Sequence, residues 1–177
     1  MTYSKSPMNI RELLLQEHSK SQSQKIASWI GNDKARFAKL ANLILEGDSL
    51  ISQRGAWILS FCGDSYPRLI IPFLDRFLNF IETAPHVAVV RNVLRVTSMI
   101  EIPEELEGKA YDLCYHLARQ SKEDIAVRAH AMTIISTLAL KYPELKPEVC
   151  DLLQALKDHD SAGLRSRSKK MIVRLKC

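Results

Sequence analysis

The sequence predicts an all-α protein whose helices form a solenoid of about five hairpins, and three observations support this prediction. Four arginines are spaced 37 residues apart: Arg54, Arg91, Arg128 and Arg165. The apolar residues that follow them recur in steps of three and four, which places them on one face of a helix. Only six glycines and seven prolines interrupt the chain, which favours long helices. A repeat period of this length is typical of stacked helical hairpins.

The first expected hairpin is short and joins residues 9–17 to residues 18–29. Its second helix carries apolar side chains at helical spacing, and Gly31 and Asn32 follow it. Both residue types tolerate the left-handed backbone conformation that often ends a helix. We expect this pair to cap the N-terminal end of the stack.

The second hairpin is expected over residues 34–45 and 50–62. Asp33 is a suitable N-cap for the first of these helices, because its carboxylate can accept hydrogen bonds from free backbone N–H groups. Gly47 stops that helix, and we expect Gly63 to end the second one.

The third hairpin, residues 67–82 and 87–100, contains the clearest departure from a regular helix. Pro67 fits the first turn, where a missing N–H costs little, but Pro72 lies one turn further in. A proline there kinks the helix or delays its start. The run Val87–Val90 could form a strand in isolation, but the 37-residue register places it at a helix start.

The last two hairpins are expected over residues 103–120 with 125–140, and over residues 143–157 with 161–176. Pro147 marks a second place where a helix can break or start late. No linker or change of composition separates the hairpins. We therefore expect one repeat domain over residues 1–177.

The net charge of +5 is unevenly distributed along the chain. Residues 161–177 contain six basic residues and no acidic one, so the rest of the chain sums to −1. We attribute the isoelectric point of 9.1 to this terminal helix. That distribution weakens a nucleic-acid-binding interpretation based on overall charge.

The ends and the cysteines favour a cytoplasmic protein without a membrane span. Residues 1–7 lack the apolar stretch of a signal peptide, and no apolar run approaches the ~20 residues that a span requires. The four cysteines form neither a Cys-x-x-Cys pair nor a zinc-binding spacing. We expect Cys62, Cys114 and Cys150 to be buried free thiols, Cys177 to be exposed and reactive, and no disulfide to form.

A Val-Arg pair that follows an acidic turn and precedes small or apolar residues occurs in the stretch Asp124-Ile125-Ala126-Val127-Arg128-Ala129-His130-Ala131. This pattern resembles the HEAT repeat of the armadillo-type superfamily, over residues 33–177 and loosely over residues 9–30. The resemblance implies an all-α, right-handed α-solenoid of about five HEAT-like helical hairpins, distantly similar to alkylation-repair HEAT-like proteins. It also implies a ladder between an Asp and the Arg of a neighbouring repeat. Pro85 breaks that pattern at the position that Asp48 holds before Arg54.

We expect the second helices of the hairpins to present a continuous concave surface. The candidate contact residues are Arg54, Arg91, Arg95, Arg128, Arg165, Lys169 and Arg174. A structural alternative stays open for the arginines of the 37-residue register, whose guanidinium groups can pair with carboxylates or helix-end carbonyls of the adjacent repeat. For Arg91 and Arg128 we expect side chains that are at least half buried and hydrogen-bonded within the stack. The run from Arg165 to Lys170 can bind a phosphate backbone or be the solvated face of a terminal cap.

Three further groups are weaker candidates. Trp57 could be an aromatic platform, but it shares a register position with Ala131, which favours a place in the core. Asp112 and His116 lie four residues apart and could form an acid–base pair or an ordinary surface pair. His130 could titrate near neutrality.

No catalytic motif is present. The chain lacks a Gly-rich phosphate loop, a His-Glu-x-x-His motif, a nucleophile elbow and the Ser-Ser-x-Met-Pro loop of the adenylosuccinate lyase superfamily. We therefore expect a non-catalytic binding or scaffold module without cofactor or metal, whose concave helical surface takes a protein or peptide partner.

The alternative is a nucleic-acid-binding HEAT-like protein related to alkylation-repair DNA glycosylases. Such an enzyme needs a carboxylate and an aromatic side chain that face each other in a groove. Asp64 and Trp57 are the nearest candidates in this sequence.

Overall fold

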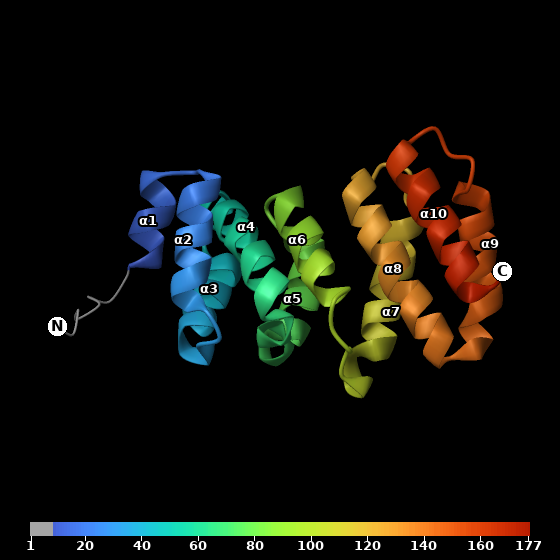
Figure 1. Cartoon of the computed structure of the whole chain (residues 1–177), viewed down its shortest axis with the longest axis horizontal. Helices are drawn as coiled ribbons and strands as arrows, with labels where there is room; N and C mark the ends of the chain where they lie inside the picture. The colour runs from blue at the N-terminus through green and yellow to red at the C-terminus, as the bar shows by residue number, and fades with distance from the viewer. Residues whose placement is uncertain (1–8) are drawn as a thin grey trace.

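The computed structural model describes residues 9–177, and the expectation drawn from residues 1–7 lies outside that range. The described residues form ten α-helices and three short 3-10 helices, without a strand. The α-helices pair into hairpins that stack along the long axis of the molecule (Figure 1). The predicted all-α solenoid is confirmed.

The helices form two layers. The first helices of the hairpins make one layer: α1 (Ile10–Gln16), α3 (Lys34–Glu46), α5 (Leu74–Phe80), α7 (Glu104–Arg119) and α9 (Lys146–Leu156). The second helices make the other, hereafter the second-helix layer: α2 (Lys20–Ile30), α4 (Ser49–Ser65), α6 (Val87–Thr97), α8 (Ile125–Lys141) and α10 (Ala162–Leu175). Each helix of the second-helix layer packs against the next one along the chain. The outward-facing side chains of neighbouring second helices therefore lie side by side on one surface of the molecule.

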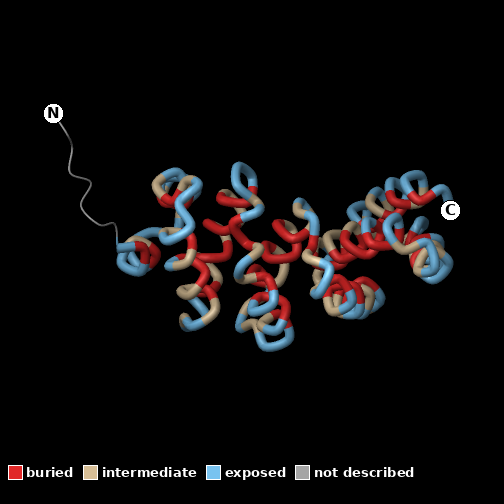
Figure 2. Tube along the Cα trace, turned by 90° about the horizontal axis from the view of Figure 1, so that it is seen from below, coloured by how far each residue is buried: buried red, intermediate tan, exposed pale blue. Residues whose placement is uncertain are grey.

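The core runs between the two layers along the whole stack. Figure 2 shows the buried residues gathered in the middle of the molecule and the exposed ones on its outer surface. In α8 the buried side chains Val127, Ala131, Ile135 and Leu138 recur at helical spacing. Leu164, Ser168 and Leu175 of α10, each 37 residues after Val127, Ala131 and Leu138, are also buried. The 37-residue period of the arginines is therefore shared by the core positions of these two repeats.

Polar side chains cap the starts of several helices, and the expected N-cap Asp33 is one of them. The carboxylates of Asp33, Asp48 and Asp124 accept hydrogen bonds from backbone N–H groups at the starts of α3, α4 and α8. At the start of α6 the Nδ1 of His86 accepts the equivalent bond from the N–H of Ala88, at 3.0 Å. These N-caps satisfy groups that have no partner within the helix.

The prolines inside predicted helices delay the regular α-helix. The segment Pro67–Phe73, which contains Pro72, is a 3-10 helix, so α5 starts only at Leu74, and a second 3-10 helix follows at Ile81–Thr83. The segment Pro143–Leu145 is a third 3-10 helix, and α9 starts at Lys146. A late start suits proline, because a missing N–H is harmless in a first turn.

Gly63 does not end α4, contrary to the sequence-based expectation, since the helix continues to Ser65. The glycine is buried in α4 and faces Val96 of α6. A Cβ atom at this position would lie 2.5 Å from Cγ2 of Val96. Gly63 therefore allows the close approach of two helices.

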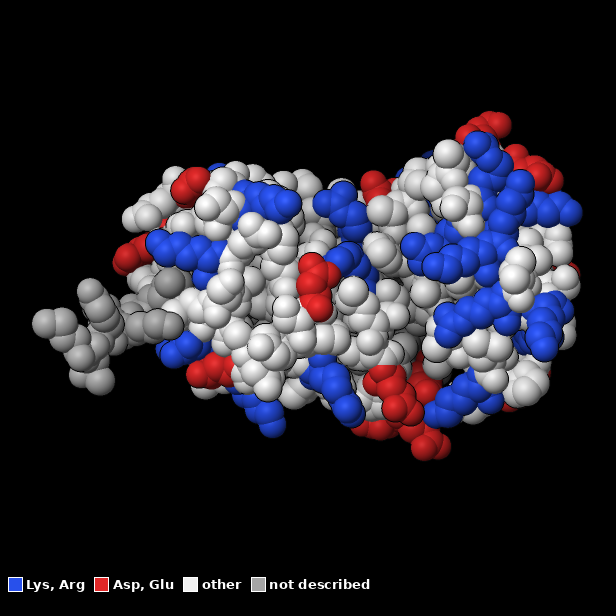
Figure 3. Space-filling view, in the orientation of Figure 1, with Lys and Arg blue, Asp and Glu red and all other residues white. Residues whose placement is uncertain are grey.

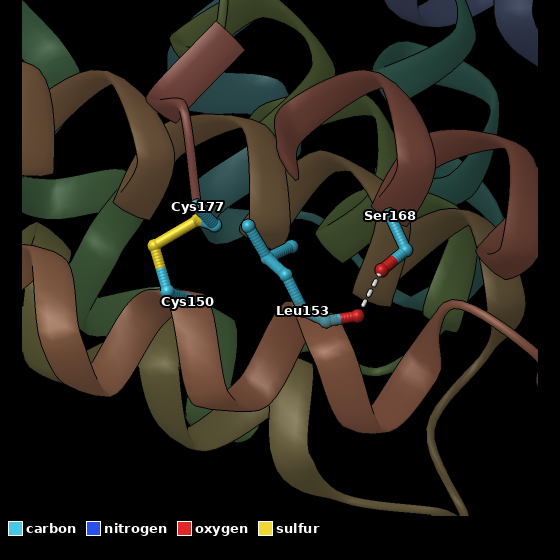
Figure 4. Close-up of a disulfide and its surroundings, with 4 residues drawn as sticks. All are labelled: Cys150, Leu153, Ser168 and Cys177. Carbon is cyan, nitrogen blue, oxygen red and sulfur yellow. Dashed lines mark hydrogen bonds between the residues drawn. A yellow bond between two sulfur atoms is a disulfide. The ribbon is translucent and has the colours of Figure 1, made fainter. Parts of the chain in front are cut away.

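Cys150 and Cys177 form a disulfide, so the expectation of four free thiols is wrong (Figure 4). The two cysteines belong to the same terminal hairpin, α9 with α10, and their Cα atoms lie 5.6 Å apart. Lys176 adopts a left-handed conformation with φ 56°, which turns the chain after α10. Next to the disulfide, the hydroxyl of Ser168 donates to the carbonyl oxygen of Leu153 and ties α10 to α9 a second time.

The other two cysteines are free and buried, as predicted. Burial raises the pKa of the Cys62 thiol to about 12 and raises the pKa of Cys114 further. Both thiols therefore stay protonated in the core, where they act as small apolar side chains.

Candidate functional site

Three arginines of the 37-residue register bind backbone carbonyl oxygens near helix ends. Arg128 donates from Nε to the carbonyl of Ala118 in the last turn of α7, at 3.0 Å. Arg54 donates to the carbonyl of Leu14 near the end of α1, at 2.5 Å. Arg165 donates to the carbonyl of His159, at 2.8 Å, in the turn that precedes α10. These bonds satisfy carbonyls that a helix or turn leaves free. Only the bond of Arg54 reaches the adjacent repeat, as the structural alternative predicted; Arg128 and Arg165 bond within their own hairpins.

Arg128 is the most enclosed of the three. Arg128 is only 3% exposed, and burial lowers the pKa of its guanidinium group. The expectation that Arg128 is buried and hydrogen-bonded is confirmed. A group this enclosed offers no surface to a ligand, so Arg128 leaves the set of contact candidates.

Arg91, the fourth arginine of the register, behaves differently. It is partly buried on α6, and within residues 9–177 its side chain makes no hydrogen bond and no ion pair. The expectation that Arg91 is hydrogen-bonded is therefore wrong. The inter-repeat ladder implied by the resemblance is also absent from the described residues, where Asp48 pairs with Arg11 at 3.8 Å instead.

A second set of cations links neighbouring helices of the second-helix layer through neutral groups. Arg167 of α10 donates to the hydroxyl of Thr133 on α8. Arg174 of α10 donates to the hydroxyl of Thr137 on α8, at 3.2 Å. The hydroxyls orient the guanidinium groups and leave their charge uncompensated.

Arg95 of α6 extends the same pattern toward α4. It donates to the carbonyl and the hydroxyl of Ser60, at 3.1 and 2.9 Å, and to the carboxylate of Asp64, at 2.6 Å. Asp64 is therefore engaged in an ion pair. This pairing argues against Asp64 as the free carboxylate of a glycosylase-like groove.

His130 lies on α8 between these arginines. Its Nδ1 is buried and has no hydrogen-bond partner among the described residues. Burial first, and then the positive charges of Arg167, Arg95 and Arg91, lower the pKa of His130 to about 4. The expectation of titration near neutrality is wrong, because these causes all favour the neutral imidazole.

Helical spacing shows how these residues line up. His130, Thr133 and Thr137 lie on one stripe of α8, and Arg167, Lys170 and Arg174 repeat that stripe 37 residues later on α10. We call Arg91, Arg95, His130, Arg167, Lys170 and Arg174 the cationic face. Lys169 is exposed, one position round the helix from Lys170, and lies outside this stripe.

The second-helix layer carries almost all of its charge as cations. Asp64 is the single acidic residue within its five helices, and α6, α8 and α10 contain none. In Figure 3, lysine and arginine side chains cover much of the surface over α10 and the adjoining part of α8, whereas acidic ones lie mostly along the edges of the molecule, most densely at the lower edge. The positive charge therefore reaches several repeats. The count along the sequence hid this, because the acidic residues of the first helices and turns cancelled it.

The remaining sequence candidates do not form a site. Trp57 is partly buried, and its ring lies 4.9 Å from the ring of His18 and 5.9 Å from that of Phe61. Asp112 and His116 are both exposed on α7, and the ring of His116 contacts the amide of Gln120 instead of Asp112.

One buried ionic group was not anticipated from the sequence. Glu107 of α7 is 5% exposed, and its carboxylate accepts hydrogen bonds from Lys141, at 2.9 Å, and from the Tyr142 hydroxyl, at 2.5 Å. Burial by itself would raise the pKa of Glu107. The hydrogen bonds from Tyr142 and Lys141 outweigh that effect, so the pKa of Glu107 is lowered. The sequence gives no sign that Glu107 is buried, because acidic residues are common in the first turn of exposed helices.

A two-layer stack of helical hairpins defines the class of α-solenoid repeat proteins. The family model described as HEAT repeat domain matches residues 10–175, so the chain belongs to the HEAT repeat family. Searches of curated proteins and of solved structures gave no match. HEAT repeats generally serve as protein-interaction scaffolds, and the family is typically non-catalytic.

Among residues 9–177, no helix combines the length and the apolar character needed to cross a membrane. Over the same residues, His, Cys, Asp and Glu side chains form no cluster of three that could hold a metal ion.

Proposed function

We propose that the chain is a non-catalytic binding module whose second-helix layer receives a protein partner. The observation that carries this proposal is the separation of charge between the layers. Cations on α6 and α10 face outward without acidic neighbours on those helices, and α8 between them carries His130, Thr133 and Thr137 on the same side. An ordinary surface mixes charges of both signs, so a one-sided face of this kind favours a charged partner.

The register arginines serve the scaffold in this proposal. Arg54, Arg128 and Arg165 hold helix-end or turn carbonyls, so their guanidinium groups are used within the stack. Of the contact candidates predicted from the sequence, Arg91, Arg95 and Arg174 remain on the proposed binding surface. Lys169 borders it.

Site-specific photo-crosslinking in cells that produce the protein naturally tests this proposal. A photoreactive amino acid is placed at Thr137 or Lys170, which are exposed on the second-helix layer, or at Asp112 or Asp151, which are exposed on first helices. We expect a discrete protein adduct from the first pair and none from the second, with the adducts identified by mass spectrometry.

The opposite pattern of adducts would contradict the proposal. Adducts only from the first-helix positions would move the binding surface to the other layer. Nucleic acid, and no protein, crosslinked to Thr137 or Lys170 would favour the nucleic-acid alternative.

A further inference from the structure

We propose that the partner binds through a short acidic segment that lies across α6, α8 and α10 on the cationic face. This inference rests on the proposed function and adds the chemistry of the partner. Glutamate or aspartate side chains of the segment would pair with Arg91, Arg167 and Arg174.

The first support is that Arg91, Arg167 and Arg174 have no carboxylate partner among the described residues. The three helices contain no acidic residue, and the nearest carboxylate within the layer, that of Asp64, is already paired with Arg95. The arginines around His130 repel one another across a partly buried site, where screening by water is reduced. Carboxylates from a partner would relieve this repulsion.

The second support is preorganisation. Thr133 and Thr137 each use one N–H of an arginine from α10. A guanidinium carries five N–H donors, so most of the donors of Arg167 and Arg174 stay available. Side chains that are already oriented lose less entropy when they bind a carboxylate, which favours paired recognition by arginine.

The width of the cationic face limits the length of the bound segment and favours a peptide over a nucleic acid. Neighbouring helices lie about 8–10 Å apart, so three helices span about 20 Å, or about six residues of extended chain. Arg54 on α4 is engaged with carbonyls, and the cationic surface therefore stops at α6. A nucleic-acid groove would need cations along the whole stack, because the number of phosphate contacts sets the affinity.

Exposed apolar side chains on the same helices also favour a protein segment. Val173 of α10 is 78% exposed and lies directly beside Arg174 in the sequence, and Leu140 at the end of α8 is 48% exposed. Aliphatic groups among cations suit a segment that mixes acidic and apolar residues. A phosphate backbone makes no use of them.

Fluorescence anisotropy with the purified chain tests the inference. The probe is a labelled peptide of about twelve residues, about twice the length needed to cross the face. It is made of glutamate and aspartate with two leucines. The matched peptide carries glutamine and asparagine in place of the acids, and labelled duplex and single-stranded DNA form the nucleic-acid arms. We expect the acidic peptide to bind, the neutral peptide not to bind, and both DNA probes to bind more weakly than the acidic peptide at physiological salt.

Two triple variants test whether binding of the peptide depends on the cationic face. Arg91→Gln, Lys170→Gln and Arg174→Gln remove three charges from it, whereas Lys34→Gln, Lys122→Gln and Lys157→Gln remove three exposed charges elsewhere. We expect the first triple variant to bind the acidic peptide about tenfold more weakly and the second to change affinity by less than about threefold. Circular dichroism checks that both variants are folded.

Equal binding of the two peptides, tighter binding of DNA, or equal losses in the two triple variants would overturn the inference. Dimerisation of the free chain that the first triple variant abolishes would also overturn it, since a second copy would then occupy the face. If Thr137 and Lys170 still crosslink to a protein in cells, the proposed function survives the failure of this inference. If they do not, the proposed function fails whatever the peptide does.

Discussion

Arg128 donates a hydrogen bond from its Nε to the carbonyl oxygen of Ala118, at 3.0 Å, and this bond joins the start of α8 to the end of α7. The arginine is 3% exposed. Arg91 holds the same register position on α6, without any such bond among the described residues. The two residues therefore offer a matched comparison of a structural and an available arginine.

We expect Arg128→Ala to lower the free energy of unfolding by about 1–3 kcal/mol, because it leaves a buried carbonyl without its partner. Arg91→Ala should change it by less than about 0.5 kcal/mol, as is usual for surface changes. Urea denaturation followed by circular dichroism measures both. Equal effects of the two substitutions would refute the separation of roles.

Reduction of the Cys150–Cys177 disulfide should lower the free energy of unfolding by about 2–4 kcal/mol. The bond closes a loop with a sequence separation of 27, and loop closure of this size restricts the unfolded chain by about that amount. The measurement is thermal unfolding with and without reductant. Cys177→Ser is the control, because the reductant should have no further effect on that variant. Two reactive thiols on the native, non-reduced wild type would show that the bond is absent.

The stability of the protein should fall as the pH drops from about 6.5 toward 4, partly through His130. The pKa of His130 is lowered to about 4 in the folded protein, whereas it lies near 6.5 in the unfolded chain. Between these values the unfolded chain binds the proton and the folded one does not, so protonation favours unfolding. Above pH 6.5 the contribution of neutral His130 to the stability is fully present, and below pH 4 protonation of His130 lowers the stability no further.

The size of the effect follows from the shift. Each pKa unit corresponds to about 1.4 kcal/mol, and partial exposure of the imidazole reduces the total to about 1–2 kcal/mol. The wild type should lose that much more stability than His130→Gln between pH 7 and pH 4. Identical pH profiles of the wild type and His130→Gln would contradict the account.

Gly63→Ala should lower the free energy of unfolding by about 1–3 kcal/mol, because the new Cβ would lie 2.5 Å from Val96 and overpacking carries such a cost. Gly108→Ala is the control, since nothing lies within 4 Å of a Cβ at that position of α7. It should stabilise the protein by up to about 1 kcal/mol through helix propensity. Val96→Ala should reduce the penalty of Gly63→Ala in a double-mutant cycle. Additive effects of the two changes would show that the residues are not in contact.

Much of the fold could be predicted from the sequence, because apolar periodicity and N-caps act locally. The arginine register, the cap residues Asp33 and Asp124 and the late start of α9 near Pro147 all follow from short-range rules. Gly63 was misjudged because its role depends on Val96, which lies on another helix. The disulfide was missed because the distance between Cys150 and Cys177 depends on how α10 folds back against α9.

The candidate site was predictable only in part. Arg91 and Arg128 share one sequence pattern, and only the packing of each repeat decides which of them is buried. The cationic face itself was hidden in a net charge counted along the chain. Counting charges helix by helix, together with the stripe of Arg167, Lys170 and Arg174, would have revealed it, since folding places alternate helices in separate layers.

The most direct test of the central claim is an NMR titration of the isotopically labelled chain with the acidic peptide. If the cationic face of the second-helix layer is the binding surface, backbone amide shifts should change in α6, α8 and α10, around Arg91, His130 and Arg174. The amides of α7 and α9 that face away from this layer should change little. Shifts confined to α7 and α9, or no change at saturating peptide, would contradict the account.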